Sequence, residues 1–203
     1  MARLSLHLGL NLVNPDAYNG WPGYLNGCVN DGTAMAALAA RAGFESRAIY
    51  NEDATIGALA DRLRFFAGSL KGGDELWVSF SGHGGRSAAW LPASYKETLC
   101  LYDGQLADTS LREMLCGFLP GVKVVMLLDS CHSGGMDRAA DGRRLVRAAP
   151  AWVAQRGRVH CALRSSSALS ASCLFITACR ADEVALDGDR NGAFTESLLE
   201  AAD

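Results

Sequence analysis

The sequence lacks several features that would place it in a broad class of protein. Its net charge is −3, so it has no surplus of basic residues of the kind that nucleic-acid-binding domains carry. It contains no apolar run of about 20 residues, the length that a membrane-spanning helix needs. Residues 4–12 alternate apolar and other residues, whereas a signal peptide carries an unbroken apolar stretch. We therefore expect a cytoplasmic protein that binds neither nucleic acid nor membranes.

The seven cysteines also lack the spacing of a disulfide framework or a zinc site. No two of them form a C-x-x-C pair, and their number is odd. Most are expected to be small buried side chains. The missing paired spacing argues against the interpretation of this chain as a thiol redox or metal-binding protein. We expect that no cofactor is required.

What the sequence does contain is an alternation of strand and helix patterns. Its 203 residues, 49% of them hydrophobic, suffice for one domain with a sizeable core. Strands are predicted at 4–12, 44–50, 75–80, 122–128 and 173–179. Helices are predicted at 32–42 and 55–67, from 108 or 110, and from 193, with Asn30 or Asp31, Thr55 and Ser110 as candidate caps. This order predicts an α/β fold with a mostly parallel sheet flanked by helices, and residues 86–107 are expected to be irregular.

Residues 136–171 differ from the rest of the chain in composition. They hold seven arginines, many alanines and a serine cluster at 165–167, and they show no apolar periodicity. We predict a flexible basic linker here, within a single domain that spans residues 1–203.

Two of the predicted strands end in loops of small residues that each hold one reactive side chain. The first reads S-G-H-G-G and contains His83, and the second reads D-S-C-H-S-G and contains Cys131. Ligands bind beyond the carboxyl ends of parallel strands, where both residues should lie. A thiol needs a neighbouring base to act as a nucleophile, and histidine is the usual one. The pattern predicts an acyl-transfer site in which the main-chain N–H groups of Gly84 and Cys131 hold the oxyanion.

The two loops resemble the catalytic signatures of metacaspases and of their bacterial relatives, the orthocaspases. His83 lies about 50 residues before Cys131, the spacing of caspase-type enzymes. The stretches 25–31, 177–180 and 187–195 resemble further family segments in the same order. The resemblance implies a caspase-like three-layer sandwich and a cysteine endopeptidase with Cys131 as nucleophile and His83 as base.

The resemblance also implies a basic substrate residue at P1, the position before the cleaved bond. It assigns the S1 pocket, which binds the P1 side chain, to Cys28, Asp31, Ser81 and Asp129. Carboxylates pair well with a guanidinium, so the expected partners are proteins or peptides with arginine or lysine at P1. Asp129 lies two residues before Cys131 and would share its strand face. Asp31 has an alternative role as a helix cap.

An enzyme that cuts after arginine and carries an arginine-rich linker can cut itself. The candidate cleavage residues are Arg143, Arg144, Arg147, Arg156, Arg158 and Arg164. Arg143 and Arg144 come first, because Asp141 and Gly142 before them favour an exposed turn. The alternative for any one of these arginines is a solvated basic loop.

The family resemblance is weakest for calcium, which many metacaspases need. Lys96 and Thr109 stand where the family pattern has carboxylate ligands, and calcium takes six or more oxygen ligands. Asp103 and Asp108, with Glu97, are candidates for a weaker site, so a calcium requirement is doubtful.

Two questions remain open from the sequence. Members of the resembled family continue with another strand and helix beyond the position of Asp203, so this chain is a fragment or has a reduced sheet edge. The alternative function is a catalytically silent caspase-fold protein that binds or scaffolds. The retained Cys131 and His83 argue against it, because a silent protein has no physical need for both.

Overall fold

The computed structural model describes residues 1–88, 95–131, 145–150, 152–153, 159–160, 168–179 and 185–202. Its strands are β1 (Arg3–Gly9), β2 (Glu45–Tyr50), β3 (Glu75–Ser81), β4 (Gly84–Ala88), β5 (Tyr95–Leu101), β6 (Gly104–Ala107), β7 (Lys123–Asp129), β8 (Val159–His160) and β9 (Ser172–Thr177). Its helices are α1 (Cys28–Arg41), α2 (Ile56–Ser69), α3 (Asp108–Leu115) and α5 (Ala193–Ala202), with short 3-10 turns at Pro15–Ala17 and Asn51–Asp53.

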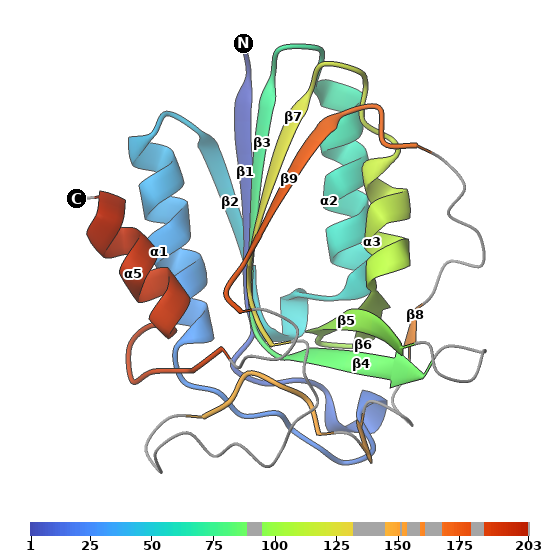
Figure 1. The fold of residues 1–203 in the computed structure, drawn as a ribbon, viewed down its shortest axis with the longest axis vertical. Coiled ribbons are helices and arrows are strands. Elements are labelled where there is room, and N and C mark those ends of the chain that lie inside the picture. Colours follow the sequence, from blue (N-terminus) through green and yellow to red (C-terminus); the bar gives the residue numbers. More distant parts are fainter. Residues whose placement is uncertain are drawn as a thin grey trace.

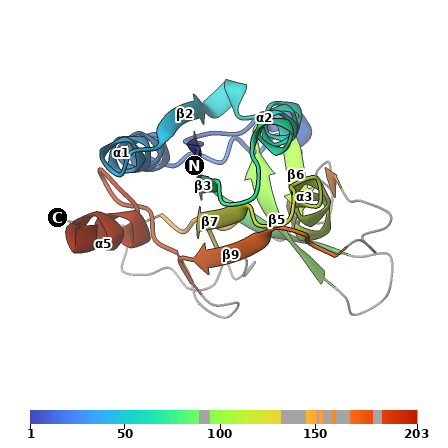
Figure 2. The ribbon, with the colours of Figure 1, turned by 90° about the horizontal axis from the view of Figure 1, so that it is seen from above.

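The central sheet is parallel and has five strands in the order β2-β1-β3-β7-β9. Helices α1 and α5 cover one face, and α2 and α3 cover the other (Figures 1 and 2). The three layers confirm the predicted α/β class, and each predicted strand has a counterpart in the sheet. The apolar run that forms β7 lies in the sheet interior, where a strand is covered on both faces.

Local signals explain where two of the helices begin and end. Thr55 caps α2 by accepting a hydrogen bond from the backbone N–H of Ala58. Gly43 follows α1 with a φ of 84°, a left-handed conformation that glycine adopts without strain. Two predicted caps were wrong. Helix α1 begins earlier, at Cys28, so Asp31 lies inside its first turn, and Ser110 lies inside α3.

The expectation that residues 86–107 are irregular was also wrong. They contribute to a second sheet with the strand order β4-β5-β6-β8, which lies beside the carboxyl end of the central sheet (Figure 1). A buried hydrogen bond from Thr98 Oγ1 to Gln105 Oε1 joins β5 to β6. The tendency of a segment to form a strand depends on its partner strand, and β4 begins with two glycines. Its sequence alone therefore does not indicate a strand.

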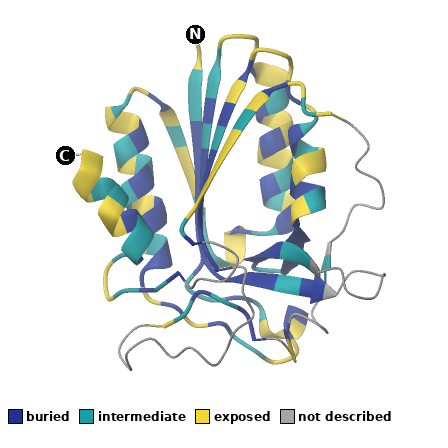
Figure 3. Cartoon of the chain, in the orientation of Figure 1, coloured by how far each residue is buried: buried dark blue, intermediate teal, exposed yellow. Residues whose placement is uncertain are grey.

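Burial follows the layers of the fold (Figure 3). The main core lies between the central sheet and the pair α2 and α3, and it includes Leu6, Leu63 and Val124. Strand β9 is the exception, because Leu174, Phe175 and Ile176 are all exposed. Within the described part of the chain, no helix is long and apolar enough to cross a membrane.

Candidate active site

His83 and Cys131 lie at one edge of the sheet because β3 and β7 are neighbours in register. Ser81 at the end of β3 is paired with Asp129 at the end of β7. Each reactive residue lies two positions beyond its pair, so both reach the same edge of the sheet. Both are buried, His83 with 5% of its surface exposed and Cys131 with none.

The imidazole of His83 is held in one orientation. Its Nε2 lies 3.1 Å from the carbonyl oxygen of Gly23, and its ring packs on Trp21 with centroids 4.6 Å apart. A carbonyl only accepts hydrogen bonds, so Nε2 carries the proton and Nδ1 is the basic nitrogen. Nδ1 has no hydrogen-bond partner among the described residues. Burial lowers the pKa of His83 to about 4, so the ring is neutral at neutral pH.

The thiol of Cys131 is held by the segment that precedes α5. Its Sγ lies 3.3 Å from the carbonyl oxygen of Ala185 and also accepts a hydrogen bond from the Ala185 N–H. Contact with the Cys179 thiol and burial raise the pKa of Cys131. The resting site therefore contains a neutral thiol and a neutral imidazole, and the thiol proton must be transferred when the sulfur attacks.

Two backbone N–H groups converge on one oxygen beside Cys131. Gly84 N lies 2.9 Å and Cys131 N lies 3.1 Å from the carbonyl oxygen of Arg147. These are the two groups that the sequence predicted for the oxyanion. A side chain at position 84 would collide with the Cys131 carbonyl, so only glycine fits there. Paired donors of this kind stabilise the charge that develops on a carbonyl oxygen during acyl transfer.

The predicted S1 residues surround the fully buried guanidinium of Arg147. Its nitrogens lie 2.6 Å from Asp31, 2.9 Å from Asp129 and 2.8 Å from Asp187, and Nη1 donates to Ser81 at 2.7 Å. The fourth predicted residue, Cys28, is also fully buried. Burial raises the pKa of its thiol, while the nearby Arg147 guanidinium acts to lower it.

Each pocket carboxylate also accepts hydrogen bonds from groups other than Arg147. Asp31 accepts from the Asn191 side chain and the Gly192 N–H. The remaining donors are Thr195 N and Oγ1 to Asp129, and the backbone N–H groups of Asn26 and Gly27 to Asp187. These donors hold the carboxylates in place. The three carboxylates are therefore positioned by other parts of the chain as well as by Arg147.

The role of Asp187 could not be inferred from the sequence. The stretch 187–195 resembles a family segment, yet nothing in it indicates that Asp187, Asn191, Gly192 and Thr195 line the S1 pocket. Asp31 does not cap α1, the alternative role that the sequence left open, because Gly27 takes the N-cap position. Its carboxylate pairs with Arg147 instead. His132 lies outside the described residues.

Residues 145–149 lie along the site as an extended segment. Val146 pairs with Leu186 in an antiparallel bridge, and Ala148 pairs with Gly84 in a parallel one. Arg147 N donates to Ala185 O, and Ala149 N donates to Gly84 O at 2.7 Å. These residues belong to the segment predicted as a flexible linker, yet they are hydrogen-bonded on both sides of Arg147. The proposed cleavage residues Arg143 and Arg144 lie outside the described part of the chain.

The calcium candidates have separate roles in the described residues. Asp103 accepts a hydrogen bond from the Ile56 N–H at the start of α2, and Asp108 accepts one from the Thr109 N–H. Lys96 Nζ donates to Thr109 Oγ1 at 3.1 Å, so an ammonium group occupies this region. Within the described ranges, no group of three or more histidine, cysteine, aspartate or glutamate side chains is placed to hold a metal ion.

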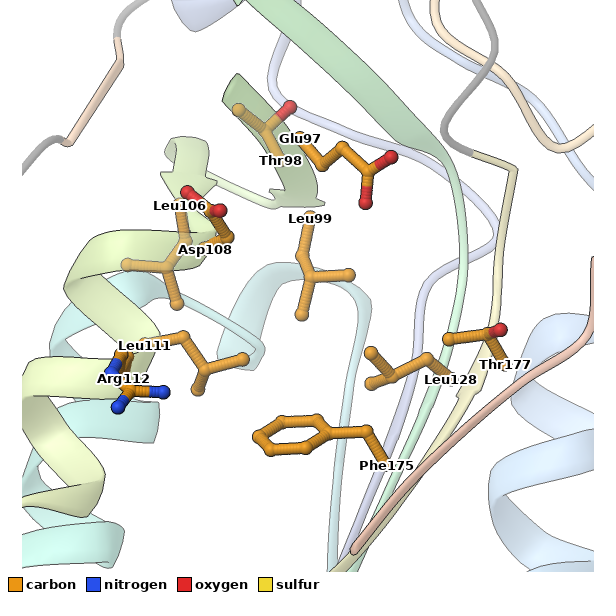
Figure 4. A pocket seen from close by; sticks show the side chains of 10 residues that line it. All are labelled: Glu97, Thr98, Leu99, Leu106, Asp108, Leu111, Arg112, Leu128, Phe175 and Thr177. Carbon is orange, nitrogen blue, oxygen red and sulfur yellow. The ribbon is translucent and has the colours of Figure 1, made fainter. Parts of the chain in front are cut away.

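A cavity of about 300 Å³ lies between α3, β5 and β9, apart from the S1 pocket (Figure 4). Leucines from α3 and from three strands line it, together with the charged residues Glu97, Asp108 and Arg112. The side chain of Phe175 on β9 also lines the cavity. Neither His83 nor Cys131 lines this cavity, so it is not the candidate active site.

Comparisons with known proteins agree with this architecture. Metacaspase-1 of Schizosaccharomyces pombe is 30% identical over 151 residues, which cover 66% of this chain and 34% of that protein. Metacaspase-3 of Trypanosoma cruzi is 28% identical over 142 residues, covering 65% of this chain and 38% of that protein. This chain therefore spans about a third of the length of the curated relatives it matches.

A solved structure and a family model extend the match to almost the whole chain. The crystal structure of protein GSU0716 from Geobacter sulfurreducens has a TM-score of 0.87 and 35% sequence identity, covering 99% of this chain and 81% of that chain. The model of the caspase domain matches residues 10–203. The chain thus belongs to the caspase-domain family of cysteine peptidases.

Proposed function

We propose that this domain is a cysteine endopeptidase that cleaves after arginine or lysine, with Cys131 as nucleophile and His83 as general base. The observation that carries the specificity is the set of three buried carboxylates, Asp31, Asp129 and Asp187, around one guanidinium. Charge-assisted pairs of this kind are the strongest hydrogen bonds that a pocket offers to an arginine side chain. They would disfavour an acidic P1 residue through like-charge repulsion.

The proposal assigns each step of the reaction to a named group. The Cys131 sulfur attacks the P1 carbonyl carbon while the thiol proton passes to His83 Nδ1. Gly84 N–H and Cys131 N–H donate to the developing oxyanion. The imidazolium then protonates the leaving amine, the peptide C–N bond breaks, and a thioester remains. Water, deprotonated by His83, hydrolyses the thioester and restores the thiol.

The choice of P1 residue tests this proposal. We expect the purified chain to cleave peptides with arginine or lysine at P1 and to leave the matched aspartyl peptide uncut. An arginyl peptide should also be cut much faster than its citrulline counterpart, because citrulline has nearly the same shape without the charge. Steady-state kinetics on the four peptides measures kcat/KM for each. Comparable rates on the arginyl and aspartyl peptides would contradict an acidic S1 pocket.

Calcium should have little effect on this activity. The Lys96 ammonium lies where the family pattern places a carboxylate ligand, and a positive charge there repels a divalent cation. We expect calorimetry to detect no tight calcium binding, and the rate on an arginyl peptide to change less than about twofold between chelator and millimolar calcium. Replacing Lys96 with aspartate should increase the calcium response. Strict dependence of the wild-type rate on calcium would contradict this expectation.

A further inference from the structure

The segment at 145–149 lies in the candidate site in the way that a peptide substrate would lie. We propose, on the basis of the endopeptidase function proposed above, that the Arg147–Ala148 peptide bond is the bond at which the chain cleaves itself. The inference rests on contacts of the Arg147 carbonyl, of its side chain and of the backbone on both sides of the bond.

The carbonyl of Arg147 lies on the two candidate oxyanion donors. Its oxygen accepts both oxyanion N–H groups, from Gly84 at 2.9 Å and from Cys131 at 3.1 Å. Because the Cys131 N–H is one of the two donors, the carbonyl lies against the residue that carries the nucleophile. An arginine that served only to neutralise buried carboxylates would need its guanidinium there, but not its carbonyl oxygen on these two donors.

The side chain of Arg147 fills the S1 pocket. It is fully buried, and its guanidinium contacts all three pocket carboxylates and Ser81. Gly192 makes room for it, because a Cβ at position 192 would collide with the guanidinium group. No other residue of the segment occupies this position, so the register of the segment is fixed with Arg147 at P1.

The backbone is held on both sides of the bond. On the amino side, Arg147 N donates to Ala185 O at 3.1 Å, and Leu145 O accepts from Asp187 N at 2.8 Å. On the carboxyl side, Ala149 N donates to Gly84 O at 2.7 Å. Strand-like pairing of an extended peptide is a common mode of peptide recognition, and it aligns the bond with the nucleophile.

The proposed cleavage balances as a hydrolysis. Cys131 Sγ bonds to the Arg147 carbonyl carbon, and its proton passes to His83 Nδ1 and then to the nitrogen of Ala148. The Arg147–Ala148 bond breaks, and Ala148 becomes a new amino terminus. One water molecule cleaves the thioester, which leaves a carboxylate on Arg147 and regenerates the Cys131 thiol.

Mass spectrometry and amino-terminal sequencing of the purified chain test the position of the cut. We expect fragments 1–147 and 148–203, with Ala148 as the new amino terminus, and a rate that does not change on dilution because the reaction is intramolecular. The Cys131→Ala chain should stay intact. Arg147→Gln should slow the cut by at least about 100-fold, since it removes a charge that three carboxylates contact.

Two further variants make the result specific. Ala148→Pro keeps Arg147 and its contacts while placing a proline after the bond, and it should also stay intact. The matched control is Arg143→Gln combined with Arg144→Gln, which should be cut at the wild-type rate. Cutting after Arg143 or Arg144 instead, with Arg147–Ala148 left whole, would overturn the proposal.

The Arg147→Gln chain separates this proposal from the endopeptidase function, because its S1 pocket no longer holds an arginine. If that variant cleaves an arginyl peptide while the wild-type chain never cuts itself at Arg147, the endopeptidase function stands and the self-cleavage proposal fails. If neither chain cuts itself or an arginyl peptide, the endopeptidase function fails as well, and the self-cleavage proposal falls with it.

Discussion

Replacing Cys131 with alanine should lower the turnover of an arginyl peptide by on the order of 10⁴-fold or more. His83→Asn should cause a loss of similar size. In the resting site the thiol and the imidazole are both neutral, so neither is a strong nucleophile or acid alone. Residues that act as one unit in proton transfer and attack lose nearly all of the rate when either is removed. Single-turnover kinetics with an arginyl peptide measures the effect on the chemical step.

The control for Cys131→Ala is Cys173→Ala, which removes a half-buried thiol from β9 away from the site. It should keep wild-type turnover. Thermal unfolding of each variant checks that the fold survives, because Cys131 is buried and its removal leaves a small cavity. A Cys131→Ala chain that retained a tenth of the wild-type turnover would show that another group is the nucleophile.

Replacing Asp31 with asparagine should lower kcat/KM for an arginyl peptide by about 30- to 5,000-fold, corresponding to about 2–5 kcal/mol. The substitution keeps the size of the side chain but removes the charge that lies 2.6 Å from the guanidinium. The same change at Asp129 should act in the same direction. Burial raises the pKa of the Asp129 carboxyl, and the Arg147 guanidinium acts in the opposite direction by favouring the charged form. The charge of Asp129 therefore depends on a cation in the pocket.

The matched control is Asp61→Asn, which removes the same charge from the exposed face of α2, where Asp61 pairs with Arg64. Surface pairs of this kind contribute about 0–1 kcal/mol, so peptidase activity should not change. The citrulline peptide gives a second control within the pocket, since Asp31→Asn should reduce its cleavage far less. Equal losses on the arginyl and citrulline peptides would indicate a general disturbance of the site rather than loss of a charge pair.

The central sheet could be predicted from the sequence because its signal is local. The run that forms β7 is almost entirely apolar, and Thr55 and Gly43 mark helix ends through their own backbone or side-chain preferences. The position of the two reactive residues could be predicted in the same way, because neighbouring parallel strands end at the same edge of the sheet. The strand pattern therefore predicts that both reactive residues reach that edge, which is where the structure has them.

The second sheet and the full set of carboxylates around Arg147 could not be predicted, because both depend on pairings between distant parts of the chain. Strand β4 begins with two glycines, and its partner β5 begins only at Tyr95. Asp187 joins the pocket only because its loop packs on the start of α1, where it accepts hydrogen bonds from Asn26 and Gly27. In the sequence, Arg147 is one of six candidate cleavage residues, and the turn signal before Arg143 and Arg144 favours those two instead.

The connectivity of the fold determines how a cut after Arg147 would be seen in the laboratory. Strand β9 and helix α5 both follow residue 147, yet β9 is paired with β7 and α5 packs on α1. The two polypeptides would thus form a split protein whose halves share one core. They should migrate together on a native gel and separate only under denaturing conditions. For the same reason, co-expression of the two halves as separate chains is a route to the processed form without any proteolysis.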